Sequence, residues 1–354
     1  MKHRAGNPYA GVAERLELAR ALPAAAYADP AVFEAEAERV LKAGWLPVAR
    51  ESEIANPGDF VCADLVGTPL MATRGADGAT HVLSRVCRHR GFILAQGKGN
   101  VRSLTCPYHL WRYGLDGALI SAPAMQGSEA FEAGACSLKA FRHERWGGWI
   151  LVNLGGEAAP LAERLGPLQA RLAACQPERM ITTGVLTFDS PWNWKVMVEN
   201  FMESYHHIGP HSATLQQTNP GLGTHPGEWG ETFTILENPP AGPDNAPFIV
   251  AAVFPLTLMY FSEGAPIGLW YEIADITPAR FTLNVHLLAS PELAASEGFA
   301  ETMKARVTTV HLEDIPACEG VQKGVTSGIY EPGPLSPLEG CLWHFHRHLQ
   351  ECFR

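Results

Sequence analysis

The spacing of hydrophobic and polar residues changes character along the chain. Apolar residues recur at helical intervals over residues 11–22, and Asp29-Pro30 places a cap residue before a proline at the first position of a helix. From about Gly44 to Asn153, short β-rich runs alternate with turn sequences such as Asp116-Gly117. This pattern predicts N-terminal helices followed by a small antiparallel β domain. Its strands are expected at residues 59–65, 70–73, 81–86, 119–120 and 149–153.

The second half of the chain mixes helical and strand patterns. Helices are predicted over residues 160–175, from near Trp192 to Gly209-Pro210, from about Pro291 past Pro316, and after the capping box Ser336-Pro337-Leu338-Glu339. Strands are predicted over residues 182–187 and at several places between Thr232 and Leu288, with the apolar run 248–261 as buried strand. The second half is therefore expected to be an antiparallel sheet flanked by helices.

These patterns predict an α+β protein with three regions. The N-terminal helices occupy residues 1–43, the small β domain residues 44–155, and the larger sheet-and-helix domain residues 156–354. A length of 354 residues, with 46% hydrophobic and 18% charged residues, is enough for a globular protein with a sizeable core.

Charge narrows the range of partners. The formal net charge is −10, and an acidic protein is repelled by nucleic-acid phosphate and by anionic membranes. The start, Met1 to Gly6, is basic but does not lead into an apolar segment, so we expect no secretory signal and a cytoplasmic location. Neither nucleic acid nor a membrane is an expected partner.

Two of the eight cysteines stand beside histidines at short spacing. Cys87-Arg88-His89 and Cys106-Pro107-Tyr108-His109 each combine one thiolate with one imidazole, and sixteen residues separate the two pairs. Such pairs suit two tight loops at the tips of β-hairpins. In a Rieske [2Fe–2S] centre, two thiolates bind one iron and two imidazoles bind the other. The alternative is a structural Cys₂His₂ zinc site, but zinc fingers usually pair cysteine with cysteine and histidine with histidine.

A second group of ligand-type residues lies in the helix predicted to start near Trp192. Glu203 is followed by His206, His207 and His211, and Gly209-Pro210 would end the helix and let His211 turn back. Two histidines and one carboxylate form the iron site of non-haem oxygenases. Geometry alone does not decide between His206 and His207, because both share a helix face with Glu203.

The motifs His89-Arg90-Gly91 and Pro107-Tyr108-His109-Leu110-Trp111 resemble the Rieske loops of the ring-hydroxylating oxygenase family, and the resemblance covers nearly the whole chain. It implies a Rieske domain followed by a helix-grip catalytic domain. One departure is Leu110, where the family usually has glycine; it removes no ligand but affects the packing or solvent cover of the loop.

The resemblance also assigns the ligands of a mononuclear iron. The family pattern of an acid followed by two histidines matches His206 and His211, which leaves His207 as a neighbour in the pocket. The late helix with Glu313-Asp314 resembles the one that provides the carboxylate, and Asp314 matches the ligand position, with Glu313 as the alternative.

Glu203 and Asn200 match two further positions of the family. Glu203 takes the place of the acid that connects an iron-binding histidine to a cluster histidine of the neighbouring subunit. Most members have Asp there, whereas Glu occurs in relatives that act on quaternary ammonium compounds. Asn200 matches a residue near the iron.

The resemblance implies the catalytic (alpha-type) subunit of a Rieske oxygenase, which uses O₂ to hydroxylate or demethylate a small organic substrate. A flavin/iron–sulfur reductase would supply electrons from NAD(P)H, directly or through a ferredoxin. A head-to-tail homotrimer would bring the cluster of one chain, through His109 or His89 and Glu203, to the iron of the next; the family pattern favours His109. Two alternatives are an aromatic-ring cis-dihydroxylating dioxygenase alpha subunit and a non-catalytic Rieske electron carrier or ligand-binding protein.

Two further groups invite a functional interpretation that the sequence does not favour. His344, His346 and His348 alternate in the last helix with no carboxylate or cysteine partner evident from the sequence, so a packing or surface role is expected. The aromatic residues Tyr260, Phe261, Trp270 and Tyr271 could form a cage for a cation, but alternating strands more often place such residues in the core.

Overall fold

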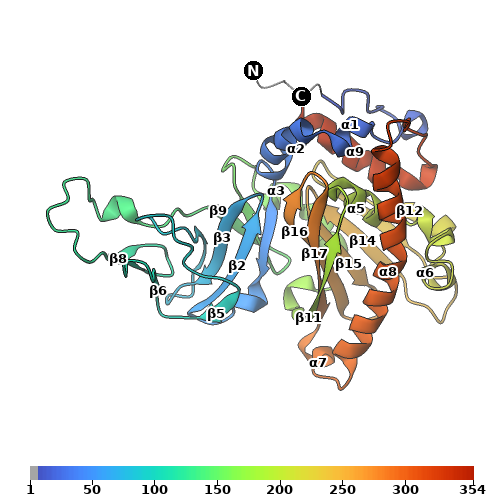
Figure 1. The fold of residues 1–354 in the computed structure, drawn as a ribbon. Helices are drawn as coiled ribbons and strands as arrows, with labels where there is room; N and C mark the ends of the chain where they lie inside the picture. The colour runs from blue at the N-terminus through green and yellow to red at the C-terminus, as the bar shows by residue number, and fades with distance from the viewer. Residues whose placement is uncertain (1–6) are drawn as a thin grey trace.

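The computed structural model describes residues 7–354 and shows a β-rich arm beside a larger sheet-and-helix body (Figure 1). Residues 1–6, which include the basic start and belong to the N-terminal region expected over residues 1–43, lie outside the described residues. The α+β class and the antiparallel sheets expected from the sequence are confirmed.

The N-terminal segment contains less helix than its spacing predicts. Asp29 caps helix α2 (Pro30–Glu36) by accepting a hydrogen bond from the Ala31 N–H, as predicted, and α1 (Ala24–Ala28) precedes it. The helix expected over residues 11–22 is wrong, because this stretch holds only a 3-10 turn (Leu16–Leu18). Its backbone bonds instead to the segment before the last helix: the Ala21 N–H donates to Gly333 (2.9 Å) and the Leu335 N–H to Ala19 (3.0 Å).

A buried ion pair ties this N-terminal segment to the body. Lys195 Nζ lies 2.8 Å from Glu36 Oε1, and both side chains are fully buried. The Tyr9 hydroxyl and the Trp194 indole N–H also donate to Glu36. Because these donors satisfy the buried carboxylate, the pair fixes the position of α2 against the helix that contains Lys195.

The arm consists of three small antiparallel sheets with strand orders β1-β10-β9, β4-β3-β2-β5 and β6-β7-β8. All five predicted strands of this region are present. The strands are β1 (Leu46–Arg50), β2 (Asp59–Leu65), β3 (Thr68–Arg74), β4 (Thr80–Ser84), β5 (Lys98–Asn100), β6 (Leu104–Thr105), β7 (Arg112–Tyr113), β8 (Leu119–Ser121), β9 (Arg142–Trp146) and β10 (Trp149–Asn153).

The body is built on one seven-stranded antiparallel sheet with the order β11-β17-β16-β15-β14-β13-β12. The apolar run 248–261 forms two strands rather than one, because the chain turns at Phe254-Pro255. The strands are β11 (Ile181–Ser190), β12 (His225–Pro226), β13 (Phe233–Asn238), β14 (Phe248–Val253), β15 (Thr257–Ser262), β16 (Ile267–Thr277) and β17 (Arg280–Ala289).

Helices cover the sheet and close the site. The helix expected from Trp192 to Gly209 is interrupted: α5 (Trp194–Phe201), capped by Asn193, ends before Glu203, and a separate 3-10 helix spans Tyr205–Ile208. The predicted helix 160–175 is likewise divided at Gly166-Pro167, where the proline lacks a backbone N–H. The other helices are α3 (Leu161–Arg164), α4 (Gly166–Leu172), α6 (Leu215–Thr218), α7 (Pro291–Ala294), α8 (Phe299–Val325) and α9 (Gly340–Cys352).

The long helix α8 runs along the sheet and contacts β11 and β17 (Figure 1). Helix α5 contacts both α8 and α9, and α9 also contacts β12 and β13. The opposite face of the sheet packs on the arm-side strand β10 and on α3 and α4 through residues such as Trp149, Leu168 and Trp270. This layering leaves the space between α5, α8 and the sheet for a cavity. Within residues 7–354, no helix has the length and apolar character needed to cross a membrane.

Candidate functional site

Two loops at the end of the arm have the same backbone hydrogen bonds. In the first, the Cys87 N–H donates to Phe92 (2.8 Å) and the Gly91 N–H donates to Cys87 (3.0 Å). In the second, the Cys106 N–H donates to Trp111 (2.8 Å) and the Leu110 N–H donates to Cys106 (2.9 Å). The two loops are therefore matched hairpin tips, and each presents one cysteine and one histidine.

The four predicted cluster ligands converge between these loops. Cys87 and Cys106 are free thiols, each only 2% exposed, and the rings of His89 and His109 lie 4.5 Å apart. Nδ1 of each histidine is buried and has no hydrogen-bond partner among residues 7–354. Two buried thiols and two buried, unpaired imidazole nitrogens on this pair of loops fit a [2Fe–2S] cluster of the Rieske type.

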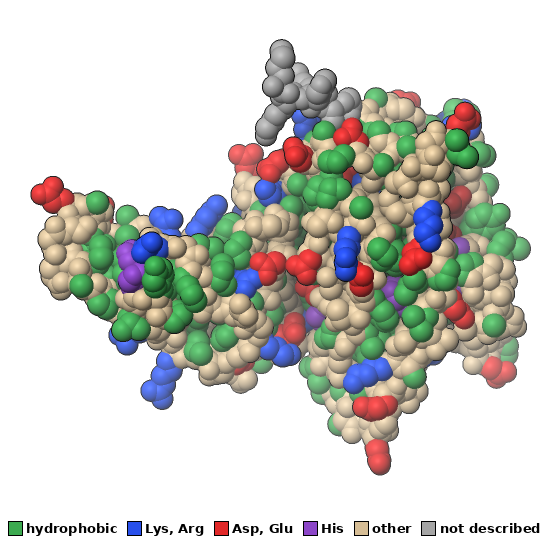
Figure 2. Space-filling view, in the orientation of Figure 1, with side chains coloured by type: hydrophobic (Ala, Val, Ile, Leu, Met, Phe, Trp, Pro, Cys, Tyr) green, Lys and Arg blue, Asp and Glu red, His purple; other side chains and the backbone are tan. Residues whose placement is uncertain are grey.

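The surface around the loops is both basic and apolar. Arg88 and Arg90 are exposed, and so are the larger part of Tyr108 (52%) and Leu110 (60%). Figure 2 shows histidine and Lys/Arg side chains beside hydrophobic ones at the end of the arm.

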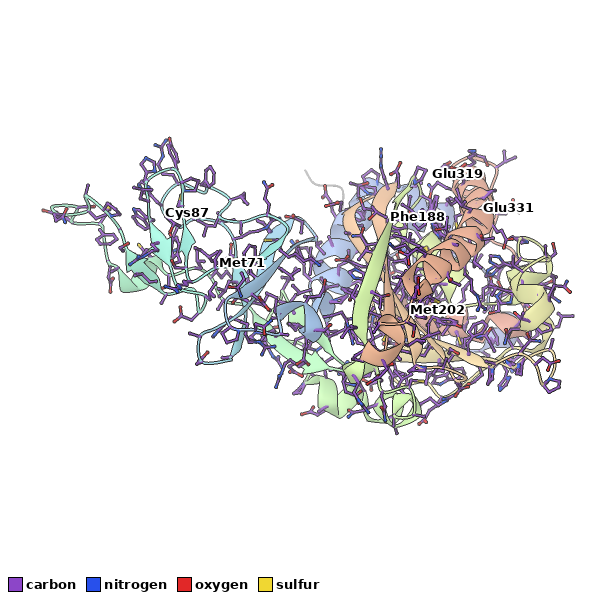
Figure 3. All side chains as sticks on the ribbon, turned by 90° about the horizontal axis from the view of Figure 1, so that it is seen from below. Met71, Cys87, Phe188, Met202, Glu319 and Glu331 are labelled. Carbon is purple, nitrogen blue, oxygen red and sulfur yellow. The ribbon has the colours of Figure 1, made fainter. Side chains whose placement is uncertain are left out.

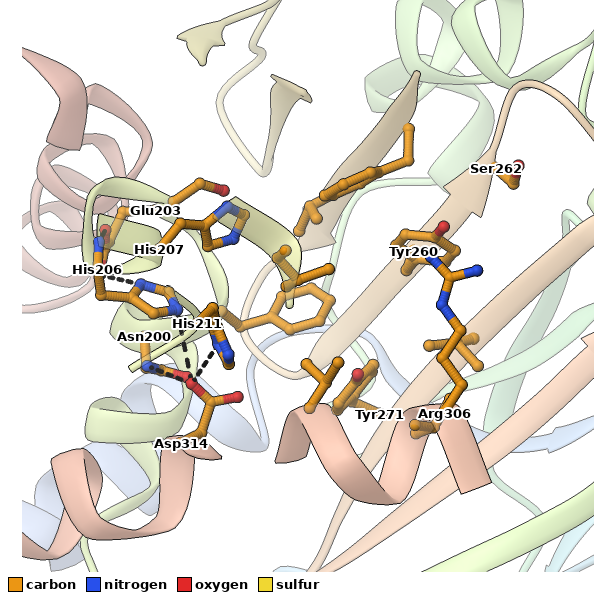
Figure 4. A pocket seen from close by; sticks show the side chains of 18 of the residues that line it. Asn200, Glu203, His206, His207, His211, Tyr260, Ser262, Tyr271, Arg306 and Asp314 are labelled. Atoms are coloured by element: carbon orange, nitrogen blue, oxygen red, sulfur yellow. Dashed lines mark hydrogen bonds and ion pairs between the residues drawn. The ribbon is translucent and has the colours of Figure 1, made fainter. Parts of the chain in front are cut away.

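His206, His211 and Asp314 come together in the body of the protein. One ligand-type atom from each lies within 4.8 Å of the others, so the three residues could hold one metal ion together. Asp314 Oδ1 is 3.0 Å from His211 Nε2 and 3.5 Å from His206 Nε2 (Figure 4). Two imidazoles and one carboxylate on one side of a cavity suit Fe(II) with open coordination positions.

Each of the two histidines forms a hydrogen bond through its Nδ1, on the side of the ring away from Asp314, with a glutamate. His206 Nδ1 lies 2.6 Å from Glu203 Oε1, and His211 Nδ1 lies 2.7 Å from Glu313 Oε2. The Thr214 hydroxyl donates to the same Glu313 oxygen (2.6 Å). A proton on Nδ1 leaves Nε2 free for a metal, and such supporting carboxylates orient the ring and raise its basicity.

Glu203 reaches His206 from an irregular segment rather than from the helix face that the sequence suggested. Because α5 ends at Phe201, Glu203 also accepts a hydrogen bond from the backbone N–H of His206 (3.1 Å). Asn200, in the last turn of α5, donates to Asp314 Oδ1 (3.3 Å). Asn200 thus restrains the carboxylate that faces both histidines.

The histidines and carboxylates of the site favour each other's charged forms. Burial lowers the pKa of His211, but the bonds to Asp314 and Glu313 outweigh it, so the pKa of His211 is raised. Burial raises the pKa of Asp314, yet its hydrogen bond and charge interaction with His211 and the charge of His206 lower it overall. The carboxylate is therefore ready to accept a cation.

His207 is not part of this set. Its Nδ1 lies 3.0 Å from the carbonyl oxygen of Asn219, so Nδ1 carries the proton. Burial lowers the pKa of His207 to about 4. The neutral ring lines the cavity as a neighbour of the three converging residues.

A cavity of about 150 Å³ lies in front of these three residues. This volume is enough for a group the size of a benzene ring. Tyr260 and Tyr271 line it, whereas Phe261 and Trp270 are buried in the core on the other side of the sheet. The four aromatic residues therefore do not form one cage.

A second hollow lies behind the site. Glu203, Asn200 and His206 line it, together with Glu199 and Glu339. Because Glu203 and His206 border both the cavity and this hollow, they separate the substrate-sized space from a surface that carries three glutamates.

The last-helix histidines do not gather at one metal site. His346 is buried, with Nε2 2.9 Å from Glu199 Oε1. His344 and His348 pack against Phe254 at ring distances of 5.5 and 4.9 Å. His344 and His348 pack as the sequence suggested, whereas His346 also has a carboxylate partner, Glu199, that the sequence did not reveal.

The cluster loops and the histidine site lie in different regions of the molecule. Figure 3 shows Cys87 near one end, in the arm, and Met202, next to Glu203, in the body. Sequence reasoning missed the support that Glu313 gives to His211, and it missed Arg306 as a cavity residue. The helical spacing of Arg306, Val310 and Asp314 is the signal that could have revealed it.

Two family models match the chain. Residues 44–141 match the Rieske [2Fe-2S] domain, and residues 178–245 and 276–354 match the ring hydroxylating alpha subunit (catalytic domain).

Curated relatives include two kinds of monooxygenase. The chain is 34% identical over 192 residues to the carnitine monooxygenase oxygenase subunit of Escherichia coli (strain K12), which covers 53% of this chain and 51% of the relative. That match thus spans about half of the relative's length. It is 26% identical over 347 residues to the chloroplastic choline monooxygenase of Spinacia oleracea, covering 94% of this chain and 78% of the relative.

Solved structures share the whole architecture. The quaternary ammonium Rieske monooxygenase CntA, in complex with an inhibitor, superposes with a TM-score of 0.89 at 22% identity, over 96% of this chain and 97% of that one. Naphthalene 1,2-dioxygenase with bound indole gives a TM-score of 0.76 at 18% identity, over 96% and 94% of the two chains. At these identities, the likeness establishes the fold.

Proposed function

Because the chain belongs to the Rieske non-haem iron oxygenases, with a Rieske domain followed by a ring-hydroxylating alpha-subunit catalytic domain, we propose that it is the terminal oxygenase of an O₂-dependent system that hydroxylates or oxidatively demethylates a small organic substrate. The observation that carries this proposal is the presence of both ligand sets in one chain. An electron carrier needs only the first, whereas two histidines and one carboxylate beside open coordination positions are the iron site of non-haem oxygenases.

Cys87, Cys106, His89 and His109 would hold the [2Fe–2S] cluster, and His206, His211 and Asp314 the mononuclear Fe(II). When bound, the cluster supplies electrons one at a time and the iron activates O₂. Electrons would come from NAD(P)H through a flavin/iron–sulfur reductase, with or without a ferredoxin. We also propose that the domains divide after residues 43 and 155 and that the protein is cytoplasmic.

The protein residues orient ligands and control water. Glu203 and Glu313 hold the Nδ1 protons of His206 and His211 and so direct both Nε2 atoms to the metal. Asn200 holds Asp314 in place. The remaining cavity wall is largely apolar, with residues such as Phe201, Leu215 and Leu269, which limits water around the reacting carbon.

A homotrimer would join the two sites that one chain keeps apart. The hollow behind Glu203 carries Glu199, Glu203 and Glu339, while the cluster loops carry exposed Arg88 and Arg90. These opposite charges support the docking of one chain's loops against the hollow of the next. Glu203 would then accept a hydrogen bond from His109 of the partner subunit and connect the cluster to His206.

The test is the content of iron and acid-labile sulfide per chain, with EPR of the dithionite-reduced protein. The proposal expects about three irons and about two sulfides, with the low average g value of a histidine-ligated cluster. About two irons that do not increase after anaerobic Fe(II) reconstitution would instead support an electron carrier. Zinc without sulfide would remove the cluster assignment.

Product analysis separates the two oxygenase reactions. One oxygen atom from ¹⁸O₂ in a hydroxylated product, or release of formaldehyde with the demethylated product, supports hydroxylation or demethylation, which the likeness to carnitine and choline monooxygenases favours. A cis-diol with two labelled atoms would support the dioxygenase, a reaction consistent with the likeness to naphthalene 1,2-dioxygenase.

A further inference from the structure

A cationic side chain borders the cavity at the end away from the metal-type residues. Arg306 of α8 lines both the inner cavity and an outer chamber of about 510 Å³. No carboxylate of residues 7–354 forms an ion pair with Arg306, whereas Arg171 and Arg280 each have a carboxylate partner at 2.7 Å. An arginine left without an acid at the mouth of a cavity is available to a ligand.

Tyr260 provides a second donor beside this arginine. In the view of Figure 4 the Arg306 side chain extends toward Tyr260, and its charge acts on the Tyr260 phenol. The Tyr260 hydroxyl makes no hydrogen bond with any of the described residues, and it is absent from their buried unpaired atoms, so it opens onto the cavity. Burial raises the pKa of Tyr260 and the charge of Arg306 opposes that rise, so the phenol stays protonated and can donate.

The spacing on α8 sets the distance from this donor pair to the metal site. Arg306, Val310 and Asp314 follow at intervals of four residues and all line the inner cavity. Eight residues of α-helix correspond to a rise of about 12 Å. A ligand that reaches both ends must therefore span several bonds between its anion and its reacting carbon.

We propose that the substrate of this chain carries a carboxylate, which Arg306 binds with help from Tyr260, while the carbon to be oxidised lies at the His206, His211 and Asp314 end. The planar guanidinium suits a carboxylate because it offers two parallel N–H donors. The role of the far end rests on the proposed oxygenase function; the anion site itself does not.

Other charges around the cavity agree with this polarity. Asp244 borders the outer chamber but forms no ion pair with Arg306, and it is exposed. Glu203 and Asp314 are at the opposite end, where histidines hold them. The cavity is thus positive at its mouth, and a carboxylate bound there points its other end inward.

The test uses isothermal titration calorimetry on the anaerobic, iron-loaded protein. The ligands are matched carboxylate and carboxamide pairs: γ-butyrobetaine, hexanoate and phenylacetate, each with its amide. We expect at least one carboxylate to bind roughly 10- to 100-fold more tightly than its amide. Arg306→Gln should abolish that preference, and Arg306→Lys should retain part of it.

Lys304→Gln is the matched control, because it also removes a positive charge from α8. The Lys304 side chain lies over Gly184 of β11 and does not line the cavity. It should keep the full preference. Tyr260→Phe, which removes only the hydroxyl, should lower carboxylate affinity roughly 3- to 10-fold and tests the site even if Arg306→Gln fails to fold.

The inference is overturned if no carboxylate exceeds its amide in the wild-type protein, or if Arg306→Gln keeps the preference. Iron and sulfide are counted on the same samples. A normal metal content without carboxylate preference defeats this inference and leaves the oxygenase proposal intact. A carboxylate preference in protein that holds no cluster or iron defeats the oxygenase proposal and leaves the anion site.

Discussion

Glu203 holds His206 by its Nδ1, with 2.6 Å between that nitrogen and Glu203 Oε1. Glu313 holds His211 in the same way from another element, α8. The two histidines are therefore fixed in the same tautomer by different segments of the chain. Each glutamate orients one histidine, and each histidine offers its Nε2 to the metal. The two glutamates can therefore be tested one at a time.

Glu203→Gln should slow electron delivery without removing iron. The amide can still contact His206 but carries no charge and accepts fewer hydrogen bonds, so reoxidation of the reduced cluster by O₂ and substrate should slow by roughly 10- to 100-fold. Stopped-flow absorbance of the cluster measures that rate, and metal analysis measures iron. Loss of the mononuclear iron with an unchanged rate per remaining iron would show that Glu203 only supports His206.

Asp314→Asn and Glu313→Gln should differ in metal content, although the residues are adjacent. Asp314→Asn removes an anionic ligand, so the mononuclear iron should be lost while the cluster remains. Glu313→Gln leaves the ligands in place and should weaken iron binding roughly 10- to 100-fold. Competition with a chelator measures both affinities. If Glu313→Gln loses iron as completely as Asp314→Asn, the assignment of the ligand is wrong.

Leu110→Gly should stabilise the arm. Leu110 has a φ of +59°, in the left-handed region, at the position where the first loop has Gly91 with φ +76°. Its side chain is 60% exposed, so little packing is lost. Glycine relieves the backbone strain of the folded state, but its greater freedom in the unfolded chain offsets part of this gain. The free energy of unfolding should therefore rise by up to about 1 kcal/mol. Urea unfolding measures it, with Leu110→Ala, which keeps the strain, expected to show no gain.

Acid should unfold the protein partly through His348. Burial lowers the pKa of His348 to about 4 in the folded state, against about 6.5 in an unfolded chain. Between these values the unfolded chain binds more protons, so stability is present above pH 6.5 and is lost as the pH falls toward 4. Lowering the pH from 7.5 to 5 should cost about 2 kcal/mol through this group.

Urea unfolding of wild type and His348→Gln at both pH values isolates that contribution from the other titrating groups. The variant should lose less stability on acidification than the wild type. Equal losses in the two proteins would mean that His348 is already charged in the folded state, or that its ring reaches water.

The sequence predicted five of the ten strands of the arm, because alternating runs bounded by Gly and Asp turns are local signals. It missed strands without such a run, such as β5, β6 and β7, which are only two or three residues long. Residue identity and spacing predicted the four residues of the cluster loops, because these signals are also local. The choice of His206 over His207, and of Asp314 as the carboxylate, came from the family resemblance. The sequence failed at residues 11–22, where apolar spacing suggested a helix but the backbone found partners in residues 333–335. Such pairing between distant segments produces no periodic pattern of apolar residues in the sequence.

The interruption after Phe201 shows the same limit at the site. Helical spacing could relate Glu203 to His206 or His207 equally, and only the break in the helix turns His207 toward Asn219. Of the two charged residues that α8 brings to the cavity, only Asp314 was predicted, because a family motif surrounds it. Arg306 has no such motif, and an arginine on a helix is normally solvated.

The distance between the cluster loops and the histidine site has a consequence for inheritance. If subunits of a ring share electrons only across their contacts, a chain with a damaged cluster and a chain with a damaged iron site are each inactive alone. Mixed in one ring, they create contacts at which an intact cluster meets an intact iron. Two defective alleles would then complement each other within a single cell.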